Sequence, residues 1–199
     1  MLTRRAFLAL GAASVALLAA GSPALAQAAE ATAFIRQLGS QLVAVVNGPG
    51  APAAKRARIE PLIEQAVDVD GIGRFCLGRF WRTSTPQQQQ EYQRLFRQVL
   101  LNNIAGRLGE FQGVGFDMTN TVERDGNAWV GTVIRRPNQQ PAQVQWVVNT
   151  QGGRPQIIDV VAEGTSLRLT QRSDYAAYIS RNGNNVDALL QAMRQQAAA

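Results

Sequence analysis

Residues 116–136, FDMTNTVER-DG-NAWVGTVIRR, decide the fold class of this chain. Apolar and polar side chains alternate on both sides of Asp125-Gly126, and a period of two residues predicts half-buried strands. An Asp-Gly pair between two such runs favours a two-residue hairpin turn, because both central positions of that turn need a positive φ. We therefore expect antiparallel strands at 116–124 and 128–136.

A second pair of alternating runs follows, at 144–150 and 156–161, on either side of Gly152-Gly153. Together the four runs predict a four-stranded antiparallel meander. Both faces of the second strand are apolar, with Trp129 on one and Val130 on the other. This pattern is explained either by cover or a cavity on each side of the sheet, or by a simple core.

Helices are predicted before and after the sheet, because apolar residues recur there at spacings of three and four. Thr85-Pro86 marks the start of the longest one, since threonine is a common N-cap and proline suits the first helical position. Pro61 is expected to kink or divide the second helix. The predicted helices are 32–47, 53–67, a short one after Asp68 to Leu77, one from Pro86 with an apolar row to Leu108, 166–182, and a last one from Asn185 or Asp187. Helices, then a sheet, then helices indicate one α+β domain.

The amino terminus is typical of an export signal. Arg4-Arg5 precede an uncharged apolar segment, and Ala24-Leu25-Ala26 is a small-residue cleavage motif. We expect residues 1–26 to be a cleaved signal peptide and residues 27–199 to be a single periplasmic domain. Arg4-Arg5 resembles a twin-arginine export motif, although two arginines also open many ordinary export signals.

Composition excludes several kinds of chemistry. The chain has no histidine, which removes histidine-based nucleophile systems, histidine-containing zinc sites and the commonest general base. Cys76 is the only cysteine, so no internal disulfide forms, and we expect a buried, unreactive thiol. Residues 27–199 carry 18 cationic against 14 anionic side chains, a net charge of +4. We expect no catalytic residues, no metal, no cofactor and no nucleic-acid partner.

Two further segments carry a family resemblance. LGRFWRTSTP at 77–86 places two aromatic residues between two arginines, and DVVAEGTSL at 159–167 is followed by Arg172-Ser173-Asp174-Tyr175. In this order, with an export signal before them, these segments resemble the MlaC family of periplasmic phospholipid carriers, also called toluene-tolerance auxiliary components. The resemblance covers nearly all of residues 27–199. Ala162 and Cys76 depart from it, since branched or aliphatic residues are usual at those positions.

The resemblance implies a fold and a function. The implied fold is a twisted sheet with helices packed over one face, enclosing an apolar lipid cavity, and with the four strands predicted above we expect that sheet to be four-stranded and antiparallel. The function is to carry phospholipid acyl chains between an outer-membrane lipoprotein complex and an inner-membrane ABC transporter complex, without enzymatic activity. Two alternatives are a hopanoid-associated lipid-binding protein of the same family and an adaptor of a membrane complex that carries nothing.

Candidate binding residues come from the inward faces of the predicted elements. Ordinary core packing is the alternative for each of them, and we expect about half to touch lipid. The residues expected to line the cavity are Phe80, Trp81, Val99, Leu100, Trp129, Val144, Trp146, Val148, Tyr175 and Ile179. Arg79, Arg82 and Arg172 are candidates for headgroup or docking contacts, with solvation at the surface as the alternative.

Overall fold

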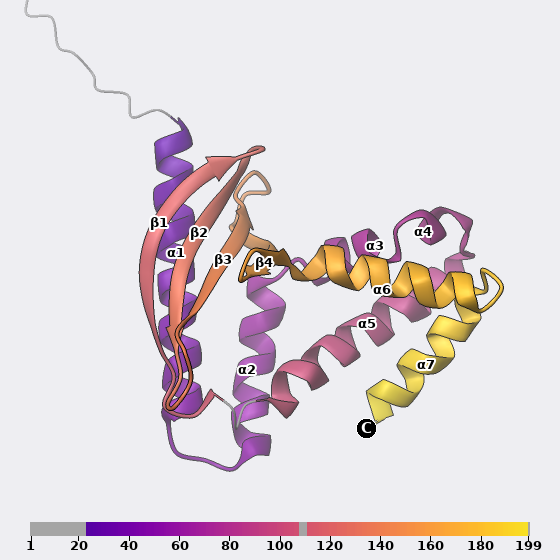
Figure 1. The fold of residues 1–199 in the computed structure, drawn as a ribbon, viewed down its shortest axis with the longest axis horizontal. Helices are drawn as coiled ribbons and strands as arrows, with labels where there is room; N and C mark the ends of the chain where they lie inside the picture. The colour runs from indigo at the N-terminus through magenta and orange to yellow at the C-terminus, as the bar shows by residue number, and fades with distance from the viewer. Residues whose placement is uncertain (1–22, 108–110, 199) are drawn as a thin grey trace, which may run out of the picture.

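A computed structural model describes residues 23–107 and 111–198 of the chain. In Figure 1, a curved sheet with helices α1 and α2 forms one side of the molecule, and helices α3 to α7 form a layer that extends away from it. Residues 1–22, most of the expected export signal, lie outside the described residues, as does Leu108 of the long-helix prediction. The α+β prediction is confirmed.

The sheet has five strands in the order β1-β2-β3-β4-β5, and all neighbours are antiparallel. Asp125 and Gly126 both have positive φ, 52° and 70°, as the predicted hairpin turn requires. The strands are β1 Gly115–Arg124, β2 Asn127–Arg135, β3 Ala142–Asn149, β4 Gln156–Ala162 and β5 Thr165–Ser166. The prediction of four strands was wrong, because a strand of two residues is too short to show alternation.

Helix α1, Pro23–Asn47, lies against one face of the sheet and contacts β1, β2 and β3. The Oγ1 atoms of Thr32 and Thr121 are 2.7 Å apart, and the Asn47 side chain bonds the backbone of Gly113 and Val114. A Cβ at Gly39 would come within 2.5 Å of the Phe116 ring, so glycine lets the helix approach β1 closely. The helix begins earlier than predicted from its apolar period.

Helix α2, Pro52–Ala66, runs beside α1 and contains Pro61 without being divided. The chain then meets the sheet: Val67 forms a parallel bridge with Ile157, and the Asp68 amide donates to the Ile157 carbonyl at 3.0 Å. Asp68 also caps α3, Val69–Leu77, by accepting from the Gly71 amide at 2.9 Å. The α2–α3 junction therefore ties the helical layer to β4.

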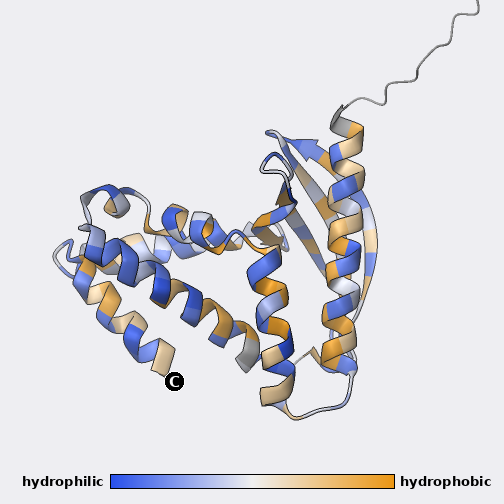
Figure 2. Ribbon diagram, turned by 180° about the vertical axis from the view of Figure 1, so that it is seen from behind, coloured by the Kyte–Doolittle hydropathy of each residue, from blue (hydrophilic) through white to orange (hydrophobic). Residues whose placement is uncertain are grey.

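The rest of the helical layer consists of α4 Arg79–Thr83, α5 Pro86–Gly106, α6 Leu167–Arg181 and α7 Val186–Ala198. Thr85 and Gln88 cap α5 reciprocally, since each side chain accepts from the other residue's amide at 3.2 and 3.0 Å. Helices α5 and α7 pack together, with Arg194 donating to Glu91 at 2.8 Å. Hydrophobic and hydrophilic residues alternate along these helices in Figure 2, as expected for helices with one buried face.

Candidate functional site

Within residues 23–107 and 111–198, no three His, Cys, Asp or Glu side chains are grouped so that they could hold a metal ion. Cys76 is buried. Burial raises the pKa of its thiol to about 12, the Asp159 charge adds to this, and Arg168 and Arg172 oppose it. The thiol therefore stays protonated and a poor nucleophile at neutral pH.

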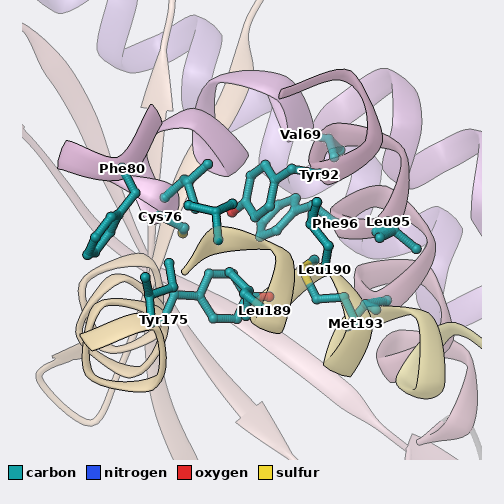
Figure 3. Close-up of a cluster of buried hydrophobic side chains, with 14 residues drawn as sticks. Val69, Cys76, Phe80, Tyr92, Leu95, Phe96, Tyr175, Leu189, Leu190 and Met193 are labelled. Atoms are coloured by element: carbon teal, nitrogen blue, oxygen red, sulfur yellow. The ribbon is translucent and has the colours of Figure 1, made fainter. Parts of the chain in front are cut away.

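Fourteen buried residues of α3 to α7 form what we call the helical cluster. Figure 3 shows their side chains pointing toward one another from several helices. Four residues expected to line a cavity belong to it, and Trp81 and Leu100 pack against it while remaining half-buried. The helical cluster is Val69, Cys76, Leu77, Phe80, Tyr92, Leu95, Phe96, Val99, Tyr175, Ile179, Val186, Leu189, Leu190 and Met193.

Tyr92 lies at the centre of this cluster. Its ring meets Trp81 and Tyr175 edge to face, with centroids 6.5 and 6.2 Å apart, and its hydroxyl donates to the Gly73 carbonyl at 2.9 Å. Burial raises the pKa of Tyr92 far above its ordinary value, so the hydroxyl remains a donor at neutral pH. The aromatic side chains thus present apolar surface with the polar group of Tyr92 satisfied internally.

A second group, which we call the sheet cluster, lies between the sheet, α1 and α2. Val148 belongs to it and Trp146 packs against it, half-buried. The Trp146 indole donates to Thr132 Oγ1 at 2.9 Å, and Thr132 donates to the Val144 carbonyl at 3.2 Å. The sheet cluster is Ala31, Ile35, Leu38, Ala66, Ala128, Val130, Val148 and Ile157. A third group joins α1 and α2 to the loop before β1, and we call it the end cluster: Val45, Val46, Ile59, Ile63 and Val114.

Trp129 and Val144 belong to none of these clusters. Register places Trp129 opposite Val147 and places Val130 opposite Trp146, so Trp129 lies on the other face of the sheet from Trp146. The Arg124 guanidinium lies 4.6 Å from the centre of the Trp129 indole. The ten expected lining residues are therefore divided between the helical layer and both faces of the sheet, and their contact with a ligand stays a prediction.

Val67 is the residue at which the three clusters meet. It is half-buried and packs against the helical, sheet and end clusters alike. Its backbone pairs with Ile157 of β4, the strand through which the helical layer mainly contacts the sheet. We call this place the seam. The sequence pattern placed Val67 only at the end of the predicted helix 53–67, since the three surfaces that converge on it come from distant parts of the sequence.

Asp159, two residues after Ile157 in β4, connects this strand to the start of α6. Its carboxylate is only 5% exposed and accepts from Ser166 Oγ at 2.6 Å, from the Arg168 amide at 3.2 Å and from the Val160 amide at 2.8 Å. The Arg168 guanidinium lies 3.3 Å away. This network gives a structural reason for the aspartate and serine of the 159–167 motif, because it fixes the start of α6 against the sheet.

The three candidate arginines gather at the surface of the helical layer. Arg79 and Arg172 line a depression of about 310 Å³. Arg79 also lines a neighbouring depression of about 430 Å³ together with Arg82. Both volumes are at the lower end of the range for pockets that hold drug-sized molecules, about 300–1,000 Å³.

Comparison with known proteins identifies the family of this chain. The family model described as MlaC protein matches residues 36–195. The toluene tolerance protein ttg2D of Pseudomonas putida is 27% identical over 138 residues, which cover 68% of this chain and 64% of that protein. A phospholipid-binding protein of Ralstonia solanacearum, solved in complex with a phospholipid, has the same fold: the TM-score is 0.75 at 22% identity, over 85% of this chain and 97% of that one. No helix in the described parts of the chain is long and apolar enough to cross a membrane.

Proposed function

This chain belongs to the MlaC family, and on that premise we propose that it is a periplasmic carrier of phospholipid between membrane complexes. The family match over residues 36–195 carries the proposal. The phospholipid in the Ralstonia solanacearum protein supports it, since the two chains share a fold. The carrier acts without chemistry on its cargo, which agrees with a histidine-free chain whose one thiol is buried.

The physical need for a carrier is large. Exposing an acyl chain of about 16 carbons to water costs about 12 kcal/mol, at about 0.8 kcal/mol for each methylene. A phospholipid with two such chains does not cross an aqueous compartment unaided at a useful rate. A protein that offers an apolar interior removes this cost, provided that its interior can open and close around the chains.

We place the proposed cavity at the seam. The helical and sheet clusters are both apolar and meet around Val67, and the helical layer contacts the sheet mainly through β4. Acyl chains that enter at the seam need to push apart only half-buried side chains, and they do not have to open a continuous core. Of the expected lining residues, half-buried Leu100 and Trp146 are the ones we propose to touch lipid at the seam, because Val148 and Ile179 are 0% exposed and already fully packed, and Trp81 lies on α4, away from the sheet.

The proposed partners follow from the family: an inner-membrane ABC transporter complex and an outer-membrane lipoprotein complex. The proposed location is the periplasm, after removal of residues 1–26. The two alternatives differ in cargo, since a hopanoid-binding protein retains a polycyclic lipid and an adaptor retains none.

Native mass spectrometry of the full chain, exported and purified without detergent, tests the proposal. We expect a bound species that organic extraction identifies as phospholipid. Val67→Asp should reduce retention, because a carboxylate at the seam opposes hydrocarbon. Val122→Asp is the matched control, since Val122 is 37% exposed on β1 and should leave retention unchanged. A wild-type protein that retains no lipid and moves none between vesicles contradicts the carrier proposal.

A further inference from the structure

The depression lined by Arg79 and Arg172 is formed where the end of α3, α4 and α6 come together, and we call it the arginine pocket. In Figure 1, α4 lies at the end of the helical layer far from the sheet, so the pocket is separate from the seam. Its volume is about 310 Å³, and no carboxylate lines it. The lining residues are Leu77, Gly78, Arg79, Phe80, Arg172 and, from α6, Ala176, Ala177 and Ser180.

Arg172 is held in place by two contacts. Its guanidinium lies 4.9 Å from the centre of the Phe75 ring, which orients it by a cation–π interaction. It also lies against Gly78, where an added Cβ would be 3.1 Å from Arg172 Nε. Gly78 has a φ of 59°, which side-chain-bearing residues rarely adopt. Glycine at this position therefore lets the backbone turn and leaves room for the guanidinium.

Arg79 is also oriented by two contacts. Its guanidinium lies 4.8 Å from the Phe80 ring centre, and Nη2 donates to Ser180 Oγ at 3.3 Å. One hydroxyl satisfies one of the five N–H groups of a guanidinium. Two oriented arginines thus share one pocket with most of their donors available.

The charges of these two arginines are not balanced nearby. Arg56, Arg97, Arg135, Arg168 and Arg194 each have a carboxylate within 4.0 Å. Among the described residues, no carboxylate comes within that distance of Arg79, Arg82 or Arg172. Residues 69–83 contain three arginines and one aspartate, and so does α6, so each of the two segments that form this pocket carries a net charge of +2.

Guanidinium groups in this arrangement suit a phosphate oxyanion, which they bind through two parallel N–H···O bonds. Leu77, Phe80 and the two alanines supply an apolar wall, which suits the carbon atoms of an ester. We propose that the arginine pocket binds the phosphate group of a phosphate ester, either a phospholipid headgroup at a membrane surface or a soluble ester. The site does not depend on the chain-binding seam and exists whether or not lipid is carried.

The first test uses glycerol 3-phosphate with the exported protein. Nitrogen-15 NMR of the arginine side chains should show saturable shifts of the Arg79 and Arg172 resonances, and sodium chloride at equal ionic strength should not reproduce them. Arg79→Gln and Arg172→Gln should each weaken binding about tenfold, as loss of one charge-assisted hydrogen bond predicts. Arg154→Gln is the matched control, because Arg154 is exposed on the β3–β4 loop.

Ala177→Leu tests whether binding needs the space of the pocket as well as its charges. Ala177 is exposed on α6 and lines the pocket, so a larger side chain fills the space without changing charge or core. We expect loss of binding with the melting temperature unchanged. The proposal is overturned if Ala177→Leu binds glycerol 3-phosphate with wild-type affinity. It is also overturned if glycerol 3-phosphate shifts the arginine resonances of the wild-type protein no more than sodium chloride does.

Vesicle flotation with phosphatidylglycerol and with phosphatidylcholine distinguishes the two sources of phosphate. If Arg79→Gln and Arg172→Gln weaken flotation and glycerol 3-phosphate binding together, the source is a lipid headgroup. If they weaken only glycerol 3-phosphate binding, the source is a soluble ester. Both results support the site, and neither is changed by failure of the lipid-retention experiment at the seam.

Discussion

The link between β4 and α6 gives the sharpest test of how the helical layer is held to the sheet. Asp159→Ala removes a carboxylate that accepts from two amides and one hydroxyl and lies 3.3 Å from the Arg168 guanidinium. The amide donors lose their acceptor inside the protein. The Arg168 side chain is 30% exposed, so water recovers part of its solvation.

The magnitude follows from these partners. Hydrogen bonds to a charged group contribute about 1.5–3 kcal/mol each, and removing one partner of a buried ion pair costs about 3–5 kcal/mol. Because Arg168 is partly hydrated, we expect the lower end, about 3 kcal/mol for Asp159→Ala. Asp159→Asn keeps the oxygen that serves the two amides and should cost about half as much, within the range for one charged hydrogen bond.

Urea unfolding followed by circular dichroism measures the change in the free energy of unfolding. At this chain length, about 3 kcal/mol corresponds to a fall in Tm of about 6–12 °C. Amide hydrogen exchange should also speed up at the start of α6 before it does in β1 or β2. Asp117→Asn is the control, since Asp117 pairs with Arg135 at an exposed position and should change stability by less than about 1 kcal/mol. If Asp159→Ala costs no more than this control, the network does not hold the layers together.

Three further perturbations test local features. Cys76 should resist alkylation at pH 8.5 until urea is added, because burial raises its pKa from 9.0 to about 12. Between these two pH values the folded state keeps a proton that the unfolded state loses, so the free energy of unfolding should fall as the pH rises from 9.0 to about 12. Alkylation of the native protein as fast as in urea would show that the thiol is accessible. Tyr92→Phe removes the hydrogen bond from the tyrosine hydroxyl to the Gly73 carbonyl and should destabilise the protein by about 1 kcal/mol in thermal melts, and an unchanged Tm would mean that this bond contributes nothing. Thr85→Ala removes half of the α5 capping box and should also cost about 1 kcal/mol, whereas Thr83→Ala, two residues before the cap, should cost less; equal losses would contradict the capping role.

Local signals in the sequence predicted most of the secondary structure. Asp125-Gly126 specifies its turn through the φ values of two adjacent residues, and Thr85-Pro86 marks the start of α5 through groups within one helical turn. Such signals depend on neighbours in the chain, so they can be recognised from the sequence without knowledge of the tertiary structure. Where the signal was too short, prediction failed, since β5 has only two residues. Of the two outcomes expected for Pro61, division of the helix does not occur, because α2 runs continuously through it.

Sequence alone determined the α+β class, the export-like start, the lack of histidine chemistry and the segments that mark the family. Only tertiary structure decided which apolar surfaces face one another. An apolar period identifies the buried face of a helix or strand but not what lies across from it, so Trp129 and Trp146 could not be assigned to opposite sides of the sheet. The meeting of three clusters at Val67 and the pairing of Arg79 with Arg172 arise because segments about 90 residues apart are brought together by packing.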